Sequence, residues 1–206
     1  MDLSIVIPAY NEEKRILTTL GKTLEFLQQR SWSYELLAVD DGSADRTVAC
    51  IEEYAQDHPE VRCVQNGRNR GKGFSVRHGI QEAQGKYIGF MDGDYKTDIA
   101  GLDDVMPLLE KGRDGVIGDR TLGATEFVVA RKAYREWGSK VFRSLLRMLM
   151  GLQGFGDTQC GFKFFQVEVV RDLFARQKVD GFMFDVEILM LANKQGYKID
   201  KIPVKW

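Results

Sequence analysis

Cysteine and histidine are scarce in this sequence of 206 residues, which contains three cysteines and two histidines. Cys50, Cys63 and Cys160 form no CxxC pair, and an odd number leaves one thiol over under any pairing. With only His58 and His78 beside them, a Cys/His zinc site is disfavoured as well. The cysteines are therefore expected to be small buried residues in a reducing compartment.

Long apolar runs and an excess of one charge are also missing. No apolar run approaches the ~20 residues that a membrane-spanning helix needs, and the first residues are too short and acidic for a secretory signal. Lysine and arginine number 29 against 30 aspartates and glutamates, whereas nucleic-acid-binding proteins usually carry a basic excess. We therefore predict a cytoplasmic, soluble protein that binds no nucleic acid, although it can still contact a membrane face.

Short apolar runs alternate with segments of helical spacing, and 44% of the residues are hydrophobic, enough for one full core. Asn11 is a candidate cap for the first helix, and Ser43 or Asp45 for the second. The strand–helix order predicts a single α/β domain over residues 1–206, with a mostly parallel central sheet and helices on both faces. Strands are predicted at 3–7, 35–39, 61–64, 86–91, 115–117, 161–165 and 199–204, and further helices after residue 73 and at 102–110, 131–152 and 186–194.

Turns with carboxylates follow the first, second and fourth strands, at 11–13, 40–43 and 92–94. Ligands of open parallel sheets bind beyond the carboxyl ends of the strands, where these turns should meet. Asp92 and Asp94 flank a glycine and are hard oxygen ligands, suited to Mg²⁺ or Mn²⁺ with positions left open for a diphosphate. The alternative is an Asx turn that caps the following helix.

Two nucleotide-binding motifs are absent. The turn at 8–12 has no GxGxxG sequence, and the stretch 67–73 has three residues between its glycines where a P-loop has four. Gly73 also stands where a P-loop has the serine or threonine that binds magnesium. We therefore expect a metal ion to neutralise the charge of a bound diphosphate.

Four ordered motifs, at 5–12 (IVIPAYNE), 39–45 (VDDGSAD), 69–73 (NRGKG) and 92–94 (DGD), resemble those of inverting family 2 glycosyltransferases of GT-A fold. Three more, at 118–120 (GDR), 157–163 (DTQCGFK) and 184–187 (FDVE), are similar to the dolichyl-phosphate glucosyltransferase and mannosyltransferase branch. The DTQCGFK string is most similar to the glucose enzymes. The resemblance covers essentially the whole chain and implies a nucleotide-sugar-binding half at 1–118 and an acceptor-binding half at 119–206.

The resemblance implies roles on the donor side. Glu12 would accept hydrogen bonds from the ribose, Asp41 or Asp40 would accept one from the base, and Asp94 would bind the metal together with Asp92. Where mannosyl relatives have a glutamine that can join the metal shell, this sequence has Lys96, so the third ligand stays open between Asp98 and water. The full set implied for the nucleotide sugar is Pro8, Ala9, Tyr10, Glu12, Asp40, Asp41, Lys72, Asp92 and Gly93.

On the acceptor side, a lipid monophosphate is already anionic and needs cationic partners more than a general base. The resemblance implies that Arg120 and Arg131 bind this phosphate, and Arg135 is suitably placed in sequence; the alternative is ordinary surface salt bridging. Asp157 would orient such an arginine or Lys163, or approach the reacting sugar. The predicted catalytic residues are Asp94, Asp157, Arg120 and Arg131.

The predicted helix at 131–152 has a basic face and an apolar face, which suits either an interfacial helix beside anionic lipid or a helix packed on the sheet. Similar enzymes continue beyond residue 206 with a tail or membrane helices. The resemblance therefore implies a missing C-terminal segment or a membrane-anchoring subunit, and a peripheral location at the cytoplasmic face of a membrane.

The predicted function is metal-dependent, inverting transfer of a hexose, glucose before mannose, from UDP-glucose or GDP-mannose to a polyprenyl or dolichyl phosphate. One alternative is a saccharide or protein hydroxyl acceptor, with Asp157, Asp185 or Glu187 as base. Either Asp185 or Glu187 is otherwise expected in a buried ion pair, Glu187 before Asp185. A further alternative is a non-catalytic sugar-nucleotide-binding subunit. A nucleotidyltransferase is a weaker alternative, because its glycine- and arginine-rich first loop is absent.

Overall fold

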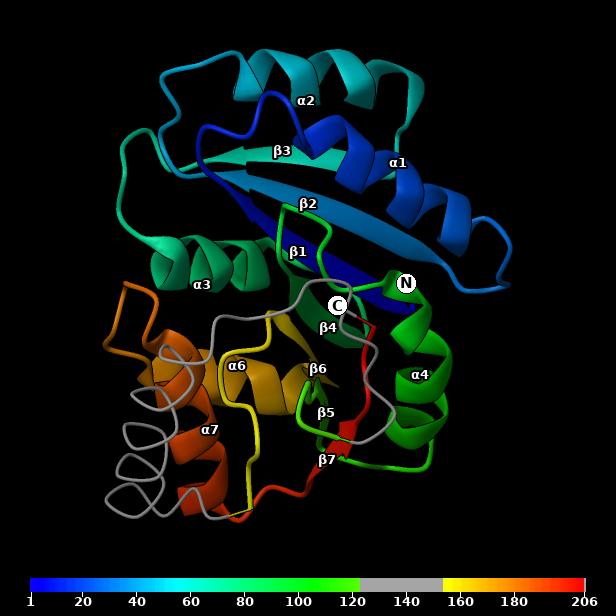
Figure 1. The fold of residues 1–206 in the computed structure, drawn as a ribbon, viewed down its shortest axis with the longest axis vertical. Coiled ribbons are helices and arrows are strands. Elements are labelled where there is room, and N and C mark those ends of the chain that lie inside the picture. The colour runs from blue at the N-terminus through cyan, green and yellow to red at the C-terminus, as the bar shows by residue number, and fades with distance from the viewer. Residues whose placement is uncertain (123–153, 206) are drawn as a thin grey trace, which may run out of the picture.

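The computed structural model of the chain describes residues 1–122 and 154–205 (Figure 1). The predicted helix at 131–152 lies outside the described residues, as do Arg131 and Arg135. No helix within the described ranges is long and apolar enough to cross a membrane.

The described strands form one mostly parallel sheet, as predicted, in the order β3-β2-β1-β4-β6-β5-β7. Within it, only β6 runs against its neighbours, pairing antiparallel with both β4 and β5. β1 pairs with β2 from Leu3–Tyr34 to Ala9–Asp40, so these two strands end together at the same edge. The strands are β1 (Leu3–Ala9), β2 (Tyr34–Asp40), β3 (Val61–Gln65), β4 (Tyr87–Met91), β5 (Gly115–Gly118), β6 (Phe162–Gln166) and β7 (Ile199–Ile202).

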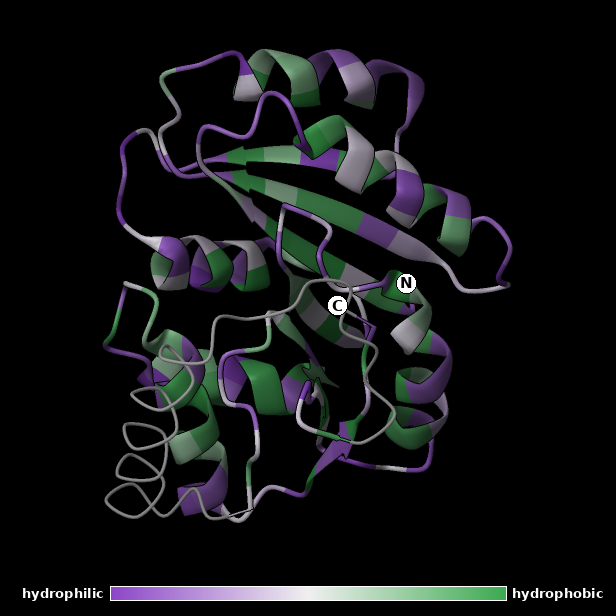
Figure 2. Ribbon diagram, viewed as in Figure 1, coloured by the Kyte–Doolittle hydropathy of each residue, from purple (hydrophilic) through white to green (hydrophobic). Residues whose placement is uncertain are grey.

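Helices cover both faces of the sheet, because successive side chains of a strand point to opposite sides. In β1, Leu3, Ile5 and Ile7 belong to one buried cluster and Val6 to the other. Figure 2 shows the hydrophobic residues gathered in the strands, with hydrophilic loops leaving the carboxyl ends of β2 and β3. The first cluster includes residues of α1 (Ile16–Leu27), α2 (Thr47–Asp57), the short 3₁₀ helix η1 (Ile99–Gly101) and α4 (Leu102–Glu110); the second includes residues of α3 (Lys72–Glu82), α6 (Val167–Arg176) and α7 (Phe184–Gln195).

Of the predicted helix caps, Asp45 lies at the start of α2, where its carboxylate accepts a hydrogen bond from the backbone N–H of Thr47 (3.0 Å), the first residue of the helix. The predicted caps at Asn11 and Ser43 are wrong, because α1 and α2 begin later, at Ile16 and Thr47. Asn11 and Ser43 join the two turns instead. The Asn11 side chain accepts a hydrogen bond from the backbone N–H of residue 44, and the Ser43 hydroxyl accepts one from the backbone N–H of Asn11. The turns after β1 and β2 are thereby held against each other at the edge where a ligand would bind.

Helix α6 is the element that the sequence analysis missed. It follows β6 without an intervening loop, so the apolar run of the strand continues into the helix and hides the change of period. Its buried residues nevertheless recur at helical spacing, at Val169, Val170, Leu173 and Phe174.

Candidate functional site

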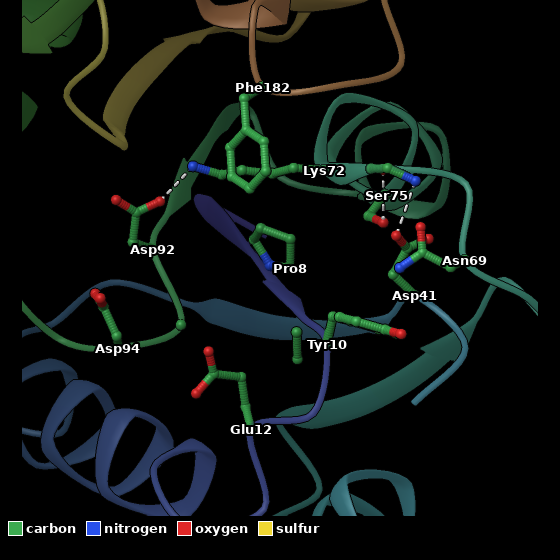
Figure 3. A pocket seen from close by; sticks show the side chains of 13 residues that line it. Pro8, Tyr10, Glu12, Asp41, Asn69, Lys72, Ser75, Asp92, Asp94 and Phe182 are labelled. Atoms are coloured by element: carbon green, nitrogen blue, oxygen red, sulfur yellow. Dashed lines mark hydrogen bonds and ion pairs between the residues drawn. The ribbon is translucent and has the colours of Figure 1, made fainter. Parts of the chain in front are cut away.

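A cavity of about 470 Å³ opens at the carboxyl ends of β1, β2 and β4 (Figure 3). The predicted turns meet there because parallel strands end at one edge of the sheet. Of the nine residues implied for the nucleotide sugar, only Asp40 is absent from its wall. The lining residues are Pro8, Ala9, Tyr10, Glu12, Asp41, Asn69, Gly71, Lys72, Ser75, Asp92, Gly93, Asp94 and Phe182.

The two neighbouring aspartates after β2 have different surroundings. The buried Asp40 carboxylate accepts hydrogen bonds from the backbone N–H groups of Gly42 (2.9 Å) and Ser43 (3.1 Å), so it shapes the turn. Asp41 lines the cavity, and its carboxylate accepts hydrogen bonds from the N–H groups of residues 70 (2.9 Å) and 71 (2.8 Å). Of the two aspartates predicted to contact a base, Asp41 is therefore the one that lines the cavity, and it also holds the glycine-rich loop in place.

The glycines of that loop serve close packing. Gly71 has a φ of +99°, and a Cβ atom there would lie 2.5 Å from the Asp180 carbonyl oxygen. At Gly73 a Cβ atom would lie 2.6 Å from the Val179 carbonyl oxygen. The loop at 69–73 therefore lies directly against the segment at 177–183. This close contact needs glycines in the loop, so the loop resembles a P-loop although the spacing of its glycines differs.

Lys72 extends from the start of α3 across the cavity wall to Asp92, with 2.5 Å between Nζ and Oδ1 (Figure 3). Burial alone would lower the pKa of Lys72, but the nearby carboxylates of Asp92 and Asp185 outweigh it, so the pKa is raised. The wall therefore holds an ammonium group beside the first carboxylate of the DGD turn.

The DGD turn is fixed from both sides. The Thr19 hydroxyl on α1 donates a hydrogen bond to the Gly93 carbonyl oxygen (2.6 Å), and a Cβ atom at Gly93 would lie 2.9 Å from the carbonyl oxygen of Pro8. A Cβ atom at Gly161 would lie 2.2 Å from Asp92 Oδ1. Glycine is therefore required on both sides of the Asp92 carboxylate for it to reach the cavity.

Asp94 forms an ion pair with Lys96 and accepts a hydrogen bond from the Lys96 backbone N–H (3.3 Å), which is an Asx turn. Contrary to the predicted alternative to metal binding, this turn does not cap the following helix. Asp98, a candidate third metal ligand, instead caps η1 by accepting a hydrogen bond from the Ala100 N–H (2.9 Å). Within the described ranges, no group of three or more His, Cys, Asp or Glu side chains is arranged to hold a metal ion. The two carboxylates at 92–94 would bind Mg²⁺ or Mn²⁺ weakly by themselves, with water or a diphosphate completing the shell.

Arg120 and Asp157 form a bidentate pair, with Nε–Oδ2 at 2.5 Å and Nη2–Oδ1 at 3.0 Å. Burial would raise the pKa of Asp157, but the Arg120 guanidinium lowers it overall. Asp157 thus orients Arg120, one of the two partners predicted for it, and the other, Lys163, is paired elsewhere. Neither member of the pair lines the cavity.

Lys163 is fully buried and pairs with Asp185 (Nζ–Oδ1 2.5 Å), while donating a second hydrogen bond to the Cys160 carbonyl oxygen (2.6 Å). Burial raises the pKa of Asp185. The expectation that Glu187 is a buried ion-pair partner is wrong, since its carboxylate accepts hydrogen bonds from the backbone N–H groups of residues 178 and 179. The geometry therefore disfavours Asp185 and Glu187 as bases for a hydroxyl acceptor.

Four lining residues were not predicted as site residues: Asn69, Gly71, Ser75 and Phe182. Asn69 and Gly71 lie in the glycine-rich motif and Ser75 lies just after it, so that motif was their only sequence signal. Phe182 is an aromatic residue outside the core, since its side chain is 76% exposed. It lies across the cavity from Glu12 (Figure 3), and nothing in its local sequence marks it as a ligand-facing residue.

The model of the glycosyl transferase family 2 domain matches residues 4–174. The chain belongs to this family. It is 35% identical to a dolichyl-phosphate beta-glucosyltransferase of Saccharomyces cerevisiae, over 99% of this chain and 66% of that protein. It is 34% identical to the human protein of the same name, over 99% of this chain and 67% of the relative. The chain thus spans about two thirds of the length of these relatives.

Solved structures show the fold of this family 2 chain. Glucosyl-3-phosphoglycerate synthase of Mycobacterium tuberculosis superposes with a TM-score of 0.72 at 20% identity, covering 99% of this chain and 70% of the other. The same enzyme in complex with Mn²⁺ and uridine-diphosphate-glucose superposes with a TM-score of 0.71 at 17% identity, covering 99% of this chain and 69% of the other. The chain therefore has the GT-A fold, as predicted.

Proposed function

We propose that this family 2 domain transfers glucose from a nucleotide diphosphate sugar to dolichyl phosphate or a related polyprenyl phosphate, with inversion at the anomeric carbon. The observation that carries the proposal is the cavity, which brings eight of the nine residues implied for the nucleotide sugar together with Asp94. The names of the yeast and human relatives support glucose and a dolichyl phosphate acceptor.

On the donor side, we assign Tyr10, Glu12 and Asp41 to the nucleoside and the DGD turn to the diphosphate. UDP-glucose is the preferred donor over GDP-mannose, supported by the relatives' names and by the related fold crystallised with that nucleotide. Asp92 and Asp94 would hold Mg²⁺ or Mn²⁺. Such a cation, when bound, offsets the charge that develops on the leaving diphosphate.

On the acceptor side, a phosphate oxygen is already anionic, so the protein has to position it and does not have to deprotonate it. Arg120, oriented by Asp157, supplies a fixed guanidinium for that purpose. Arg131 and Arg135 remain further candidates. The acceptor oxygen attacks the anomeric carbon on the side opposite the leaving diphosphate, which inverts the configuration. The pairing and lowered pKa of Asp157 suit an orienting role better than that of a base.

A long-chain lipid phosphate resides in a membrane, so the domain would work at a membrane surface, and we propose its cytoplasmic face. It would be held there by a partner subunit or by a segment outside residues 1–206. Co-sedimentation of the purified chain with vesicles that contain dolichyl phosphate, compared with vesicles that lack it, tests whether the domain alone has this affinity.

The deciding experiment supplies purified protein with radiolabelled UDP-glucose or GDP-mannose, Mn²⁺ or Mg²⁺, and dolichyl phosphate in detergent. We expect organic-extractable label from UDP-glucose that depends on the cation and on dolichyl phosphate. Label transferred to an added saccharide and not to the lipid would contradict the proposed acceptor. Stabilisation by a sugar nucleotide without transfer or hydrolysis would indicate a binding subunit instead.

A further inference from the structure

The two carboxylates of the DGD turn are each neutralised by a lysine, but the two lysines differ. The Lys72 side chain is 17% exposed and is confined between Asp92 and the aromatic ring of Phe184, whose centroid lies 5.8 Å from Nζ. The Lys96 side chain is 56% exposed, while its partner Asp94 is only 18% exposed. Lys72 is therefore part of the wall, whereas Lys96 reaches Asp94 from the solvent side.

The backbone holds Lys96 over Asp94. Tyr95, between them, has a φ of +51°, a left-handed conformation that costs a non-glycine residue about 1–2 kcal/mol. The bend brings the Lys96 N–H to Asp94 Oδ1 (3.3 Å) and lets the side-chain ammonium contact Oδ2 of the same carboxylate. Lys96 thus approaches Asp94 through both its backbone and its side chain.

An exposed ion pair of this kind is weak and easily exchanged, because water screens it and a long side chain must be ordered to make it. The lysine stem is flexible, so its ammonium can leave one oxygen for another a few ångströms away. Asp94 lines the cavity where the diphosphate is assigned. An ammonium displaced from Asp94 therefore stays next to anionic phosphate oxygens.

We propose that Lys96 is a diphosphate-binding residue: it neutralises Asp94 in the empty site and, when a divalent cation takes that carboxylate, transfers its ammonium to the diphosphate of the donor. The inference rests on the proposed function and deepens it, because it assigns a residue to the leaving group that the family motifs leave without a role. A methionine at this position would neither compete for Asp94 nor carry charge to the phosphates, and unlike a glutamine it offers no oxygen to the metal shell.

The test compares wild type with Lys96→Met in two binding measurements that need no turnover. The first is a titration with Mn²⁺ alone, monitored through the electron paramagnetic resonance signal of the free ion. It should show about three- to tenfold tighter binding in the variant, since the competing ammonium is gone. Calorimetry with UDP and with GDP at saturating Mn²⁺ should show about three- to tenfold weaker binding of the nucleotide that wild type accepts, and unchanged binding of the corresponding nucleoside.

Two controls isolate the contact. Lys96→Arg keeps the charge and should behave like wild type in both titrations. Lys22→Gln removes the same charge nearby, from a side chain whose ammonium lies 4.7 Å from the centroid of the Tyr95 ring, and should also behave like wild type. If Lys96→Met and Lys22→Gln change Mn²⁺ affinity equally, the effect comes from the general electrostatic field and the proposal is wrong.

Unchanged Mn²⁺ affinity in Lys96→Met, or equal weakening of nucleoside and nucleoside diphosphate binding, would overturn the proposal. These outcomes are separable from failure of the proposed function. A wild-type protein that binds Mn²⁺ and UDP yet transfers nothing to dolichyl phosphate would contradict the acceptor alone. A wild-type protein that binds neither nucleotide would contradict the donor assignment, and the titration with Mn²⁺ alone would still decide whether Lys96 competes for Asp94.

Discussion

Charged groups are held in two different ways on the two sides of β4. Towards β1 and β2, Asp41, Asp92 and Asp94 line an open cavity, with backbone N–H groups or lysines as partners. Towards β6, the Lys163–Asp185 pair lies almost without solvent contact, with side chains 0% and 4% exposed. Groups at the cavity can exchange their partners for a ligand, whereas the buried pair has to stay matched for the chain to fold. Variants on the cavity side should therefore lose turnover, whereas variants of the buried pair should lose stability.

The largest effect is expected from Lys163→Met, which leaves Asp185 buried without its partner. The free energy of unfolding should fall by about 3–5 kcal/mol, measured by urea denaturation. The double variant Lys163→Met/Asp185→Leu, which removes both charges, should recover most of that loss. A double variant as unstable as the single one would mean that the hydrogen bond from Lys163 to the Cys160 carbonyl oxygen, and not charge pairing, is what matters.

On the cavity side, Asp94→Asn should lower turnover at least a hundredfold while the melting temperature hardly changes. The carboxylate lies in a surface turn, so its charge is needed for the diphosphate end of the site and not for packing. Initial rates of transfer and a thermal melt on the same preparation check this. Near-normal turnover would show that Asp94 takes no part in the reaction. A large fall in the melting temperature would show that Asp94, like Lys163, is needed for stability.

Part of this contrast was predictable from sequence and part was not. Asp92 and Asp94 were identified because residues that follow a strand in a repeated strand–helix pattern must lie at the ligand edge, which is a local inference. That Lys72 reaches Asp92 and that Lys163 pairs with Asp185 depends on contacts between residues 20 and 22 positions apart. No periodicity encodes such pairs, and the choice between Asp157–Arg120 and Asp157–Lys163 had to wait for the antiparallel placement of β6.

The Asp157–Arg120 pair gives a pH-dependent test of the buried side. Because the pKa of Asp157 is lowered in the folded protein, its contribution to stability is complete above the unfolded value near 3.9 and is lost as the pH falls through the folded value. Asp157→Asn should cost about 2 kcal/mol at pH 7. The gap between wild type and variant, measured by urea denaturation from pH 7 down to pH 3, should narrow towards acid. A constant gap would show that Asp157 is not held ionised by Arg120.

The smallest effect on folding is expected at Phe182, where sequence reasoning failed. Because its side chain is 76% exposed, Phe182→Ser should change the free energy of unfolding by no more than about 0.5 kcal/mol. It lines the cavity, however, so the affinity for a sugar nucleotide, measured by calorimetry, should fall a few-fold through lost contact area. Val179→Ser is the matched control, since Val179 is an exposed residue of the same loop that does not line the cavity. If both variants bind the nucleotide as wild type does, the open side of the cavity next to α7 takes no part in donor binding. The donor would then contact only the turns after β1, β2 and β4 and the glycine-rich loop.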